Sequence, residues 1–161
     1  MRLTVGNGID KYISQLETLS RTADDTIGKA VYAGADIIAD QIKHNIEELP
    51  VQDQYGKAQQ ITGIRTMQKK GLMESFGIAR MRNEMGYIHV KAGFDGYNGL
   101  KTARYPQGQP NAMIARTFES GNSFTKKTPF VAPAIRAKKD AAERKMADVV
   151  DTEIRNHISG G

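Results

Sequence analysis

Residues 24–46 read DDTIGKAVYAGADIIADQIKHNI, and this stretch decides the fold class. Its apolar side chains recur at steps of three and four residues, which places them on one stripe of an α-helix. The stripe consists of Ile27, Val31, Ala35, Ile38, Ile42 and Ile46. We therefore expect a long amphipathic helix from about Asp24 to Asn45. It must end before Pro50, because the residue preceding a proline resists the α conformation.

The ends and the middle of this helix carry further signals. Thr22 is a candidate N-cap, and Asp24 and Asp25 fall in the first turn, where the helix dipole favours anions. Gly34 lies near the middle on the apolar side and costs about 1 kcal/mol relative to alanine. The close approach of another backbone would explain why glycine occupies this position. A shorter helix is expected before this one, at about Ile9 to Leu19.

The second half of the chain predicts a hairpin followed by two helices. Residues 75–82 and 87–94 alternate in polarity around the turn 83–86, which indicates two antiparallel strands in a small sheet around 73–95. A short helix should run from about Asn111 to Glu119, and a long amphipathic helix from about Pro133 to His157. The expected class is α+β, with two long helices and a short helix packed on the sheet.

The chain has the length of a single domain, spanning 1–161, with two long connections. Residues 50–70 are rich in glutamine and show no sustained apolar period. Residues 95–111 are rich in glycine and proline, which break regular structure. We expect both segments to be mobile loops, and long loops in compact domains are usually functional or disordered.

The net charge of +5 is distributed unevenly along the chain. Residues 1–56 hold 5 basic and 9 acidic residues, 57–105 hold 9 and 3, and 106–161 hold 9 and 6. An acidic part of one copy can dock on a basic part of the next, which favours head-to-tail ring contacts. The alternative is that solvated faces simply differ in sign.

The sequence predicts neither an enzyme nor a cofactor. It has no cysteine, which excludes disulfides and thiolate metal sites and fits a reducing compartment. His44, His89 and His157 are scattered, without the converging ligands that a metal site needs. The stretch 93–99 is glycine-rich but lacks the ending of a phosphate-binding loop. No apolar run is long enough to span a membrane.

One basic stretch suggests contact with nucleic acid. It comprises Arg65, Lys69, Lys70, Arg80 and Arg82. No helix-turn-helix, zinc finger or RNA-recognition strand accompanies it, so any contact with DNA is expected to be non-specific. A nucleic-acid-binding accessory protein that uses residues 57–105 is therefore the alternative function.

Three patterns occur in order along most of the chain, from about 20 to 157. A long helix exits through Leu49-Pro50-Val51, a hairpin is entered through 71–76 (GLMESF), and 118–122 (FESGN) precedes 128–134 (TPFVAPA) at the last helix. Together they resemble the neck or tail-completion proteins of long-tailed bacteriophages, which are minor virion components at the head–tail junction.

The resemblance implies a structural protein of the virion, made in the host bacterial cytoplasm, that completes the tail and joins it to the DNA-filled head. It implies a homo-oligomeric ring, sixfold or a multiple, that contacts head-closure and tail-terminator or tail-tube proteins. The candidate assembly contacts are Phe118, Glu119, Gly121, Pro129, Phe130 and Pro133. The two prolines restrict the backbone around Phe130, whose ring can anchor in its own core or in a neighbour's pocket, the former being favoured.

Overall fold

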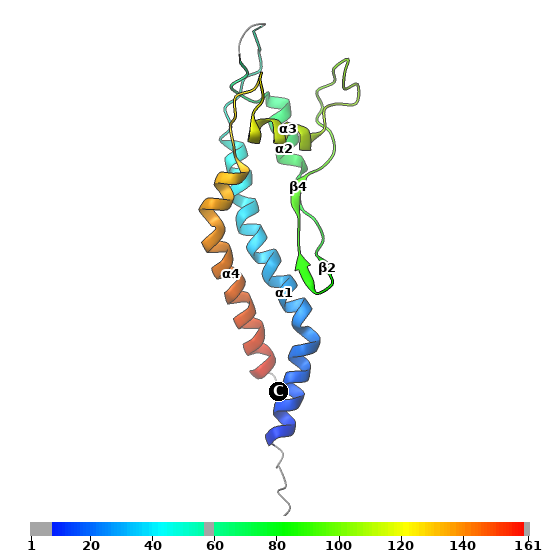
Figure 1. The fold of residues 1–161 in the computed structure, drawn as a ribbon, viewed down its shortest axis with the longest axis vertical. Helices are drawn as coiled ribbons and strands as arrows, with labels where there is room; N and C mark the ends of the chain where they lie inside the picture. The colour runs from blue at the N-terminus through cyan, green and yellow to red at the C-terminus, as the bar shows by residue number, and fades with distance from the viewer. Residues whose placement is uncertain (1–7, 57–59, 160–161) are drawn as a thin grey trace, which may run out of the picture.

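The computed structural model describes residues 8–56 and 60–159, and within the first range the side chains from Lys11 onward. It contains, in order, α1 (Gly8–Glu47), α2 (Thr66–Ser75), β1 (Phe76–Ile78), β2 (Arg82–Glu84), β3 (Tyr87–His89), β4 (Ala92–Phe94), α3 (Asn111–Ser120) and α4 (Val131–Ser159). The helices α1 and α4 form a long stem, and α2, α3 and the connecting loops gather at one end of it, the head end (Figure 1). Two long helices with short antiparallel strands confirm the α+β class.

The two helices expected before Pro50 are one continuous helix. Thr22 is not an N-cap but an interior residue of α1, and its hydroxyl donates to the carbonyl of Thr18 at 3.0 Å. Side chains of this type bond to the carbonyl four residues back when they lie inside a helix. Neither glycine nor proline occurs between Leu19 and Asp24, so nothing in the backbone ends the helix there. At 1.5 Å per residue, α1 is about 60 Å long. The side chain of Ile9 lies outside the described residues.

Helices α1 and α4 pack antiparallel along the stem. The Nζ of Lys29 lies 2.9 Å from a carboxylate oxygen of Glu153, and the side chain of Asn45 donates to the carbonyl of Phe130 at the opposite end. Gly34 fits the prediction of a close approach, because a Cβ there would lie 2.7 Å from the side chain of Met146 and 3.4 Å from a backbone oxygen of α4. None of the described helices is both long and apolar enough to cross a membrane.

Helix α2 was not predicted, because it begins inside the segment 50–70 that we expected to be a loop. Only Leu72 of its ten residues is fully buried, so it has no apolar stripe to detect. It depends on tertiary contacts instead. The carboxylate of Asp53 accepts hydrogen bonds from the amide and the hydroxyl of Thr66, at 2.8 and 2.7 Å, and so caps the helix start. Residues 57–59 of the predicted loop lie outside the described residues.

The hairpin is confirmed, but it consists of two short ladders. β1 pairs with β4, and β2 pairs with β3, both antiparallel. Between the ladders, three residues (79–81) face two (90–91), so the hairpin contains a bulge. The hydroxyl of Tyr32 on α1 accepts the amide of Met81 and donates to the carbonyl of Ala79, which ties the bulge to the stem. The predicted turn is a two-residue loop of Met85 and Gly86, both with positive φ.

The segment 95–110 contains no helix and no named strand, but its base is hydrogen-bonded. Asn98 is only 3% exposed, and its side-chain oxygen accepts the amides of Leu100 and Gln109 at 2.8 and 3.4 Å. The backbone of Asn98 also receives support, since its amide donates to the carbonyl of Gln109. The loop therefore projects from the head end on an ordered base (Figure 1).

The core lies where α1 meets α2, α3 and the start of α4. Its largest fully buried side chains are Ile46, Ile64, Leu72, Ile114 and Phe130. Farther along the stem the burial is thinner. Ile27, in the predicted apolar stripe, and Ile135, in the predicted last helix, remain 43% and 44% exposed. The stripes are therefore only partly covered within one subunit.

Candidate assembly site

The junction between α3 and α4 is organised by one carboxylate. Glu119 accepts hydrogen bonds from the backbone amides of Phe130, Val131 and Ala132, at 2.8, 2.9 and 2.9 Å. Amides at the start of a helix have no partner within it, so Glu119 caps α4 from a distant position in the chain. Partial burial opposes ionisation, but the three amides and Lys127 outweigh it, and the pKa of Glu119 lies below its ordinary value.

Gly121 sets the direction of the chain between the two helices. It ends α3 with φ 71°, and its amide donates to the carbonyl of Thr117 at 2.8 Å. A Cβ at this position would lie 2.9 Å from the backbone nitrogen of Lys127. The following loop then returns to α3, where the amide of Thr128 donates to the carbonyl of Phe118 at 2.8 Å. The left-handed conformation and the close approach together require glycine.

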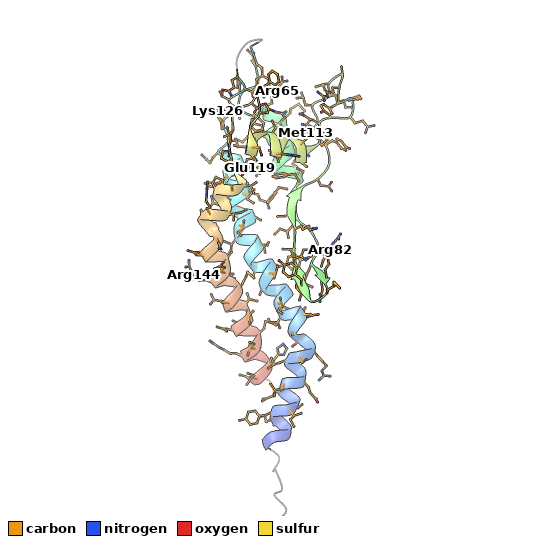
Figure 2. All side chains as sticks on the ribbon, in the orientation of Figure 1. Arg65, Arg82, Met113, Glu119, Lys126 and Arg144 are labelled. Carbon is orange, nitrogen blue, oxygen red and sulfur yellow. The ribbon has the colours of Figure 1, made fainter. Side chains whose placement is uncertain are left out.

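The structure brings all six predicted assembly candidates into this junction. Phe118 and Phe130 are 4% and 1% exposed, and the rings of Phe130 and Phe94 pack edge to face with centroids 6.0 Å apart. Phe130 thus occupies its own core, as the sequence analysis favoured. Pro129 is exposed and Pro133 is half-buried, on either side of that ring. The six residues lie at the junction from which α4 leaves the head end (Figure 2, where Glu119 is labelled).

The predicted basic residues do not form one patch. Arg65, Lys69 and Lys70 lie at or in α2, whereas Arg80 and Arg82 lie on the hairpin; Arg65 and Arg82 are well separated in Figure 2. Lys69 is engaged at the end of α1, where its Nζ donates to the carbonyls of Glu47 and Leu49. A cation at a helix C-terminus stabilises that helix. The guanidinium of Arg65 lies 4.5 Å from the ring centre of Tyr55.

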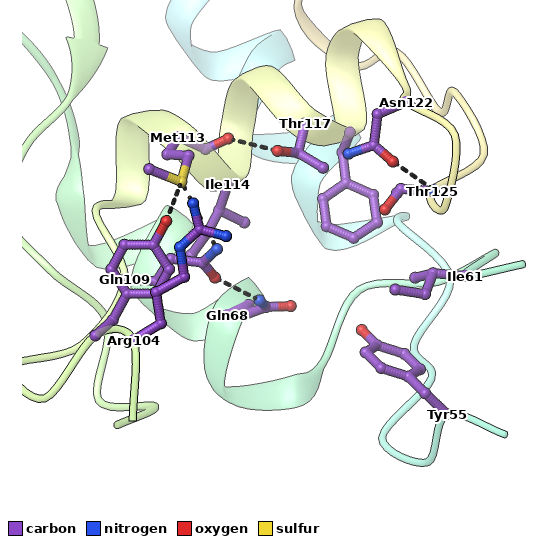
Figure 3. Close-up of a pocket in the computed structure, with 12 residues that line it drawn as sticks. Tyr55, Ile61, Gln68, Arg104, Gln109, Met113, Ile114, Thr117, Asn122 and Thr125 are labelled. Carbon is purple, nitrogen blue, oxygen red and sulfur yellow. Dashed lines mark hydrogen bonds between the residues drawn. The ribbon is translucent and has the colours of Figure 1, made fainter. Parts of the chain in front are cut away.

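A cavity of about 460 Å³ opens at the head end between the loops (Figure 3). Met113, Thr117 and Phe118 line it from α3, Tyr55 and Ile61 from one loop, and Arg104 and Gln109 from the other. The side-chain amide of Gln68 donates to Gln109 at 3.2 Å. Among the described residues, no group of three or more His, Asp or Glu side chains is arranged to hold a metal ion. The lining mixes aromatic and aliphatic side chains with amides, hydroxyls and one guanidinium.

The comparison with known protein families is decisive for the class of protein. The family described as "Bacteriophage HK97-gp10, putative tail-component" matches residues 10–106, which is more than half of the chain. The chain belongs to this family. The matched residues contain nearly all of α1, α2 and the hairpin, so they cover one of the two stem helices and part of the head end. No curated protein and no solved structure matches the chain.

This protein is therefore a structural component of a bacteriophage tail, which is part of the virion. The predicted resemblance to phage proteins of the head–tail region is confirmed by the family. The segment 128–134, which is part of the third pattern of the resemblance, lies outside the matched residues. There is a physical reason why segment 118–122 is followed by segment 128–134. Glu119 in the former caps helix α4, which begins in the latter.

Sequence reasoning missed several surface residues of the tail component. Phe124 is 75% exposed on the loop that links α3 to α4, and Lys126 and Lys127 beside it are exposed as well. The loop is held by backbone hydrogen bonds to Ile61, through the carbonyl of Phe124 and the amide of Lys126. A polar loop with a single aromatic residue has no periodic signal, so only its place in the structure reveals it.

Proposed function

We propose that this tail component completes the tail and joins it to the DNA-filled head, as a ring of identical copies. Its family membership supports a role in the tail. The observation that carries self-assembly is the exposed apolar surface of the stem. Large apolar side chains that are more than a third exposed there are Tyr12, Ile13, Leu16, Ile27, Ile135, Ile154 and Ile158. Large apolar surfaces that stay exposed on a subunit mark interaction surfaces.

Charge supports the same proposal. Residues 8–49, which contain α1, hold eight acidic and four basic residues, whereas the hairpin at 76–94 holds three basic and one acidic residue. Surfaces of opposite sign steer copies together and select their orientation. The remaining contacts of the ring are with head-closure and tail-terminator or tail-tube proteins.

A phage that lacks the gene provides the test. Infected cells should accumulate DNA-filled heads and separate tails, and a plasmid copy of the gene should restore joined particles. Electron microscopy of the lysates counts the filled heads, the separate tails and the joined particles. Joined particles in normal numbers without the gene would contradict the proposal, as would the loss of filled heads.

The alternative function, non-specific contact with DNA, is favoured by one observation. Lys126 and Lys127 are exposed at the head end (Figure 2, where Lys126 is labelled), and Arg104 is exposed in the segment 95–110. Replacing Lys126 and Lys127 by alanine should weaken binding to duplex DNA and reduce its salt dependence. The matched control replaces Lys138 and Lys139 on the stem, which removes the same charge. Equal binding by the two double variants would contradict a contact at the head end.

We also propose that the protein has no catalytic activity, because neither the motifs nor the described side chains assemble a reaction centre. Incubation with plasmid DNA and divalent metal ions should leave the DNA intact. Metal-dependent cleavage that persists through purification and disappears in an Asp95→Ala variant would contradict a purely structural role.

A further inference from the structure

An apolar groove runs along the stem beside the hairpin. Its volume is about 370 Å³. The floor is formed by α1, one wall by the hairpin and the other by the start of α4. Its lining includes Ala35, Ile38, Ile42, Phe76, Val90, Phe94, Val131 and Ile135. We name this surface the stem groove. Every side chain that lines it is apolar, so in an isolated subunit the groove exposes apolar surface to water.

A second uncovered apolar surface lies at the far end of the same helix. The side-chain amide of Gln15 donates to the carbonyl of Ile158, so α4 ends beside Gln15 while α1 continues beyond it. Tyr12, Ile13 and Leu16 are 68%, 48% and 66% exposed at this point, which we name the apolar tip. Figure 1 shows the start of α1 extending past the end of α4. The apolar tip therefore lies on the part of α1 that has no stretch of α4 beside it.

The two surfaces cannot cover each other within one subunit. Leu16 and Ala35 are 19 residues apart in an uninterrupted helix, which separates them by about 30 Å along its axis. A continuous helix cannot fold back on itself, so the apolar tip reaches a stem groove only on another molecule. We propose that the apolar tip of one copy docks in the stem groove of a second copy, as an amphipathic helix in an apolar groove.

Charge along the contact has matching signs. The hairpin wall of the stem groove carries Arg80, Arg82 and Lys91 against the single acid Glu84. Around the apolar tip, residues 8–20 of α1 hold the acids Asp10 and Glu17 against Lys11, and residues 8–49 as a whole hold eight acidic and four basic residues. An incoming helix with an excess of carboxylates is attracted to a basic wall, and this attraction favours the correct partner and approach.

The contact joins two different surfaces, so each copy offers a groove and a tip to separate neighbours. Such head-to-tail contacts close into a ring where the rotation between copies allows it. The subunits must then be inclined to the ring axis, because the tip of one copy meets the middle of the next. The inference rests on the proposed ring and specifies its interface.

Disulfide cross-linking tests the contact, and the chain is suited to it because it has no cysteine. A Leu16→Cys variant and an Ile135→Cys variant are mixed in equal amounts and oxidised, and dimers are measured on non-reducing gels. The mixture should form at least about tenfold more dimer than either variant alone, because a disulfide requires Cα atoms within about 7 Å. The control mixture pairs Leu16→Cys with Asp40→Cys, an exposed residue of α1 outside the groove, and should give only background.

A second variant separates docking from folding. Leu16→Asp, introduced into the chain that carries Ile13→Cys and mixed with Ile135→Cys, should reduce cross-linking by about tenfold or more through loss of an apolar anchor. Its melting temperature should stay unchanged, because Leu16 is mostly exposed in the subunit. Cross-linking that is unaffected by Leu16→Asp would overturn the proposal.

Native mass spectrometry of the same samples distinguishes this contact from the ring itself. Assembled copies without the mixed cross-link would overturn the contact and leave the proposed ring standing. Dimers formed mainly by Leu16→Cys alone would show tip-to-tip packing and would also overturn it. Protein that remains monomeric under all conditions would contradict both the contact and the ring, and a different virion protein would then occupy the groove.

Discussion

Glu119 joins two segments of the chain that the sequence shows only as separate motifs. Its carboxylate replaces the hydrogen bonds that the first amides of α4 lack, and it does so from the last turn of α3. Phe130 lies directly beside this cap and packs into the core, so the start of α4 is fixed both by polar contacts and by apolar burial. The junction is therefore expected to be sensitive to single substitutions.

We expect Glu119→Gln to reduce the free energy of unfolding by about 1–2 kcal/mol at pH 7, as other lost helix caps do. The pKa of Glu119 is lower in the folded protein than its ordinary value of 4.5. The cap therefore contributes fully above pH 4.5 and is lost as the pH falls through the folded-state pKa. Urea unfolding at pH 7 and at about pH 3 measures this, and the difference between the two proteins should shrink at the lower pH. A difference that grows on acidification would contradict the assignment.

Phe130→Ala should cost about 3–5 kcal/mol, because it empties a large buried site in the core. Lys139→Ala is the comparison. Lys139 is exposed and its nearest partner, Glu143, lies 3.9 Å away in solvent, so the change should stay within about 0.5 kcal/mol. Thermal melting of the purified subunits gives both values. A Phe130→Ala variant that melts like the original protein yet fails to join heads and tails would show that the side chain of Phe130 acts at an interface between proteins instead of in the core.

Among the elements, the hairpin and the loop 95–110 show how much the chain relies on contacts distant in sequence. In the bulge of the hairpin, the amide of Met81 and the carbonyl of Ala79 find their hydrogen-bond partner in the hydroxyl of Tyr32 on α1. The loop is organised around the buried Asn98, whose side chain replaces strand pairing by accepting two loop amides. We predicted mobile loops, and hydrogen exchange of the free subunit would measure the mobility directly.

Asn98→Ala removes the acceptor for the amides of Leu100 and Gln109 and leaves buried groups without partners. We expect a loss of about 1–3 kcal/mol in the free energy of unfolding. The amide of Leu100 should also exchange faster with solvent. Gln107→Ala, at an exposed position of the same loop, is the control and should change neither quantity. Unaltered exchange at Leu100 in the Asn98→Ala variant would show that the loop does not depend on this side chain.

At the scale of the whole molecule, an elongated stem carries a compact head end. The core is concentrated at the head end, whereas the stem has a thin apolar seam that is partly open to water. Such a division suits a subunit whose folding is secured at one end and whose contacts are made along the other. The uneven charge of α1 and the hairpin then contributes to how copies meet.

Self-association of the subunit should weaken as salt rises, because the attraction between the acidic α1 and the basic hairpin is screened. The Debye length falls from about 10 Å at 0.1 M to about 3 Å at 1 M salt. Analytical ultracentrifugation across this range measures the change, and the association rate should fall more than the lifetime of the assembly. Association that strengthens with salt would show that apolar burial dominates and that charge has no role in assembly.

The sequence by itself determined the elements whose evidence is local. Apolar periodicity predicted both long helices over most of their length, and alternation of polarity predicted the hairpin. The order of motifs also indicated the phage family. Only the tertiary structure decided that the first helix is continuous, that α2 exists, and that Glu119 caps α4. For α2 and α4 the stabilising partner lies more than ten residues away in the sequence: Asp53 for α2 and Glu119 for α4. Contacts between residues whose separation along the chain follows no rule produce no repeating pattern in the sequence. They become visible only when the fold brings the two segments together.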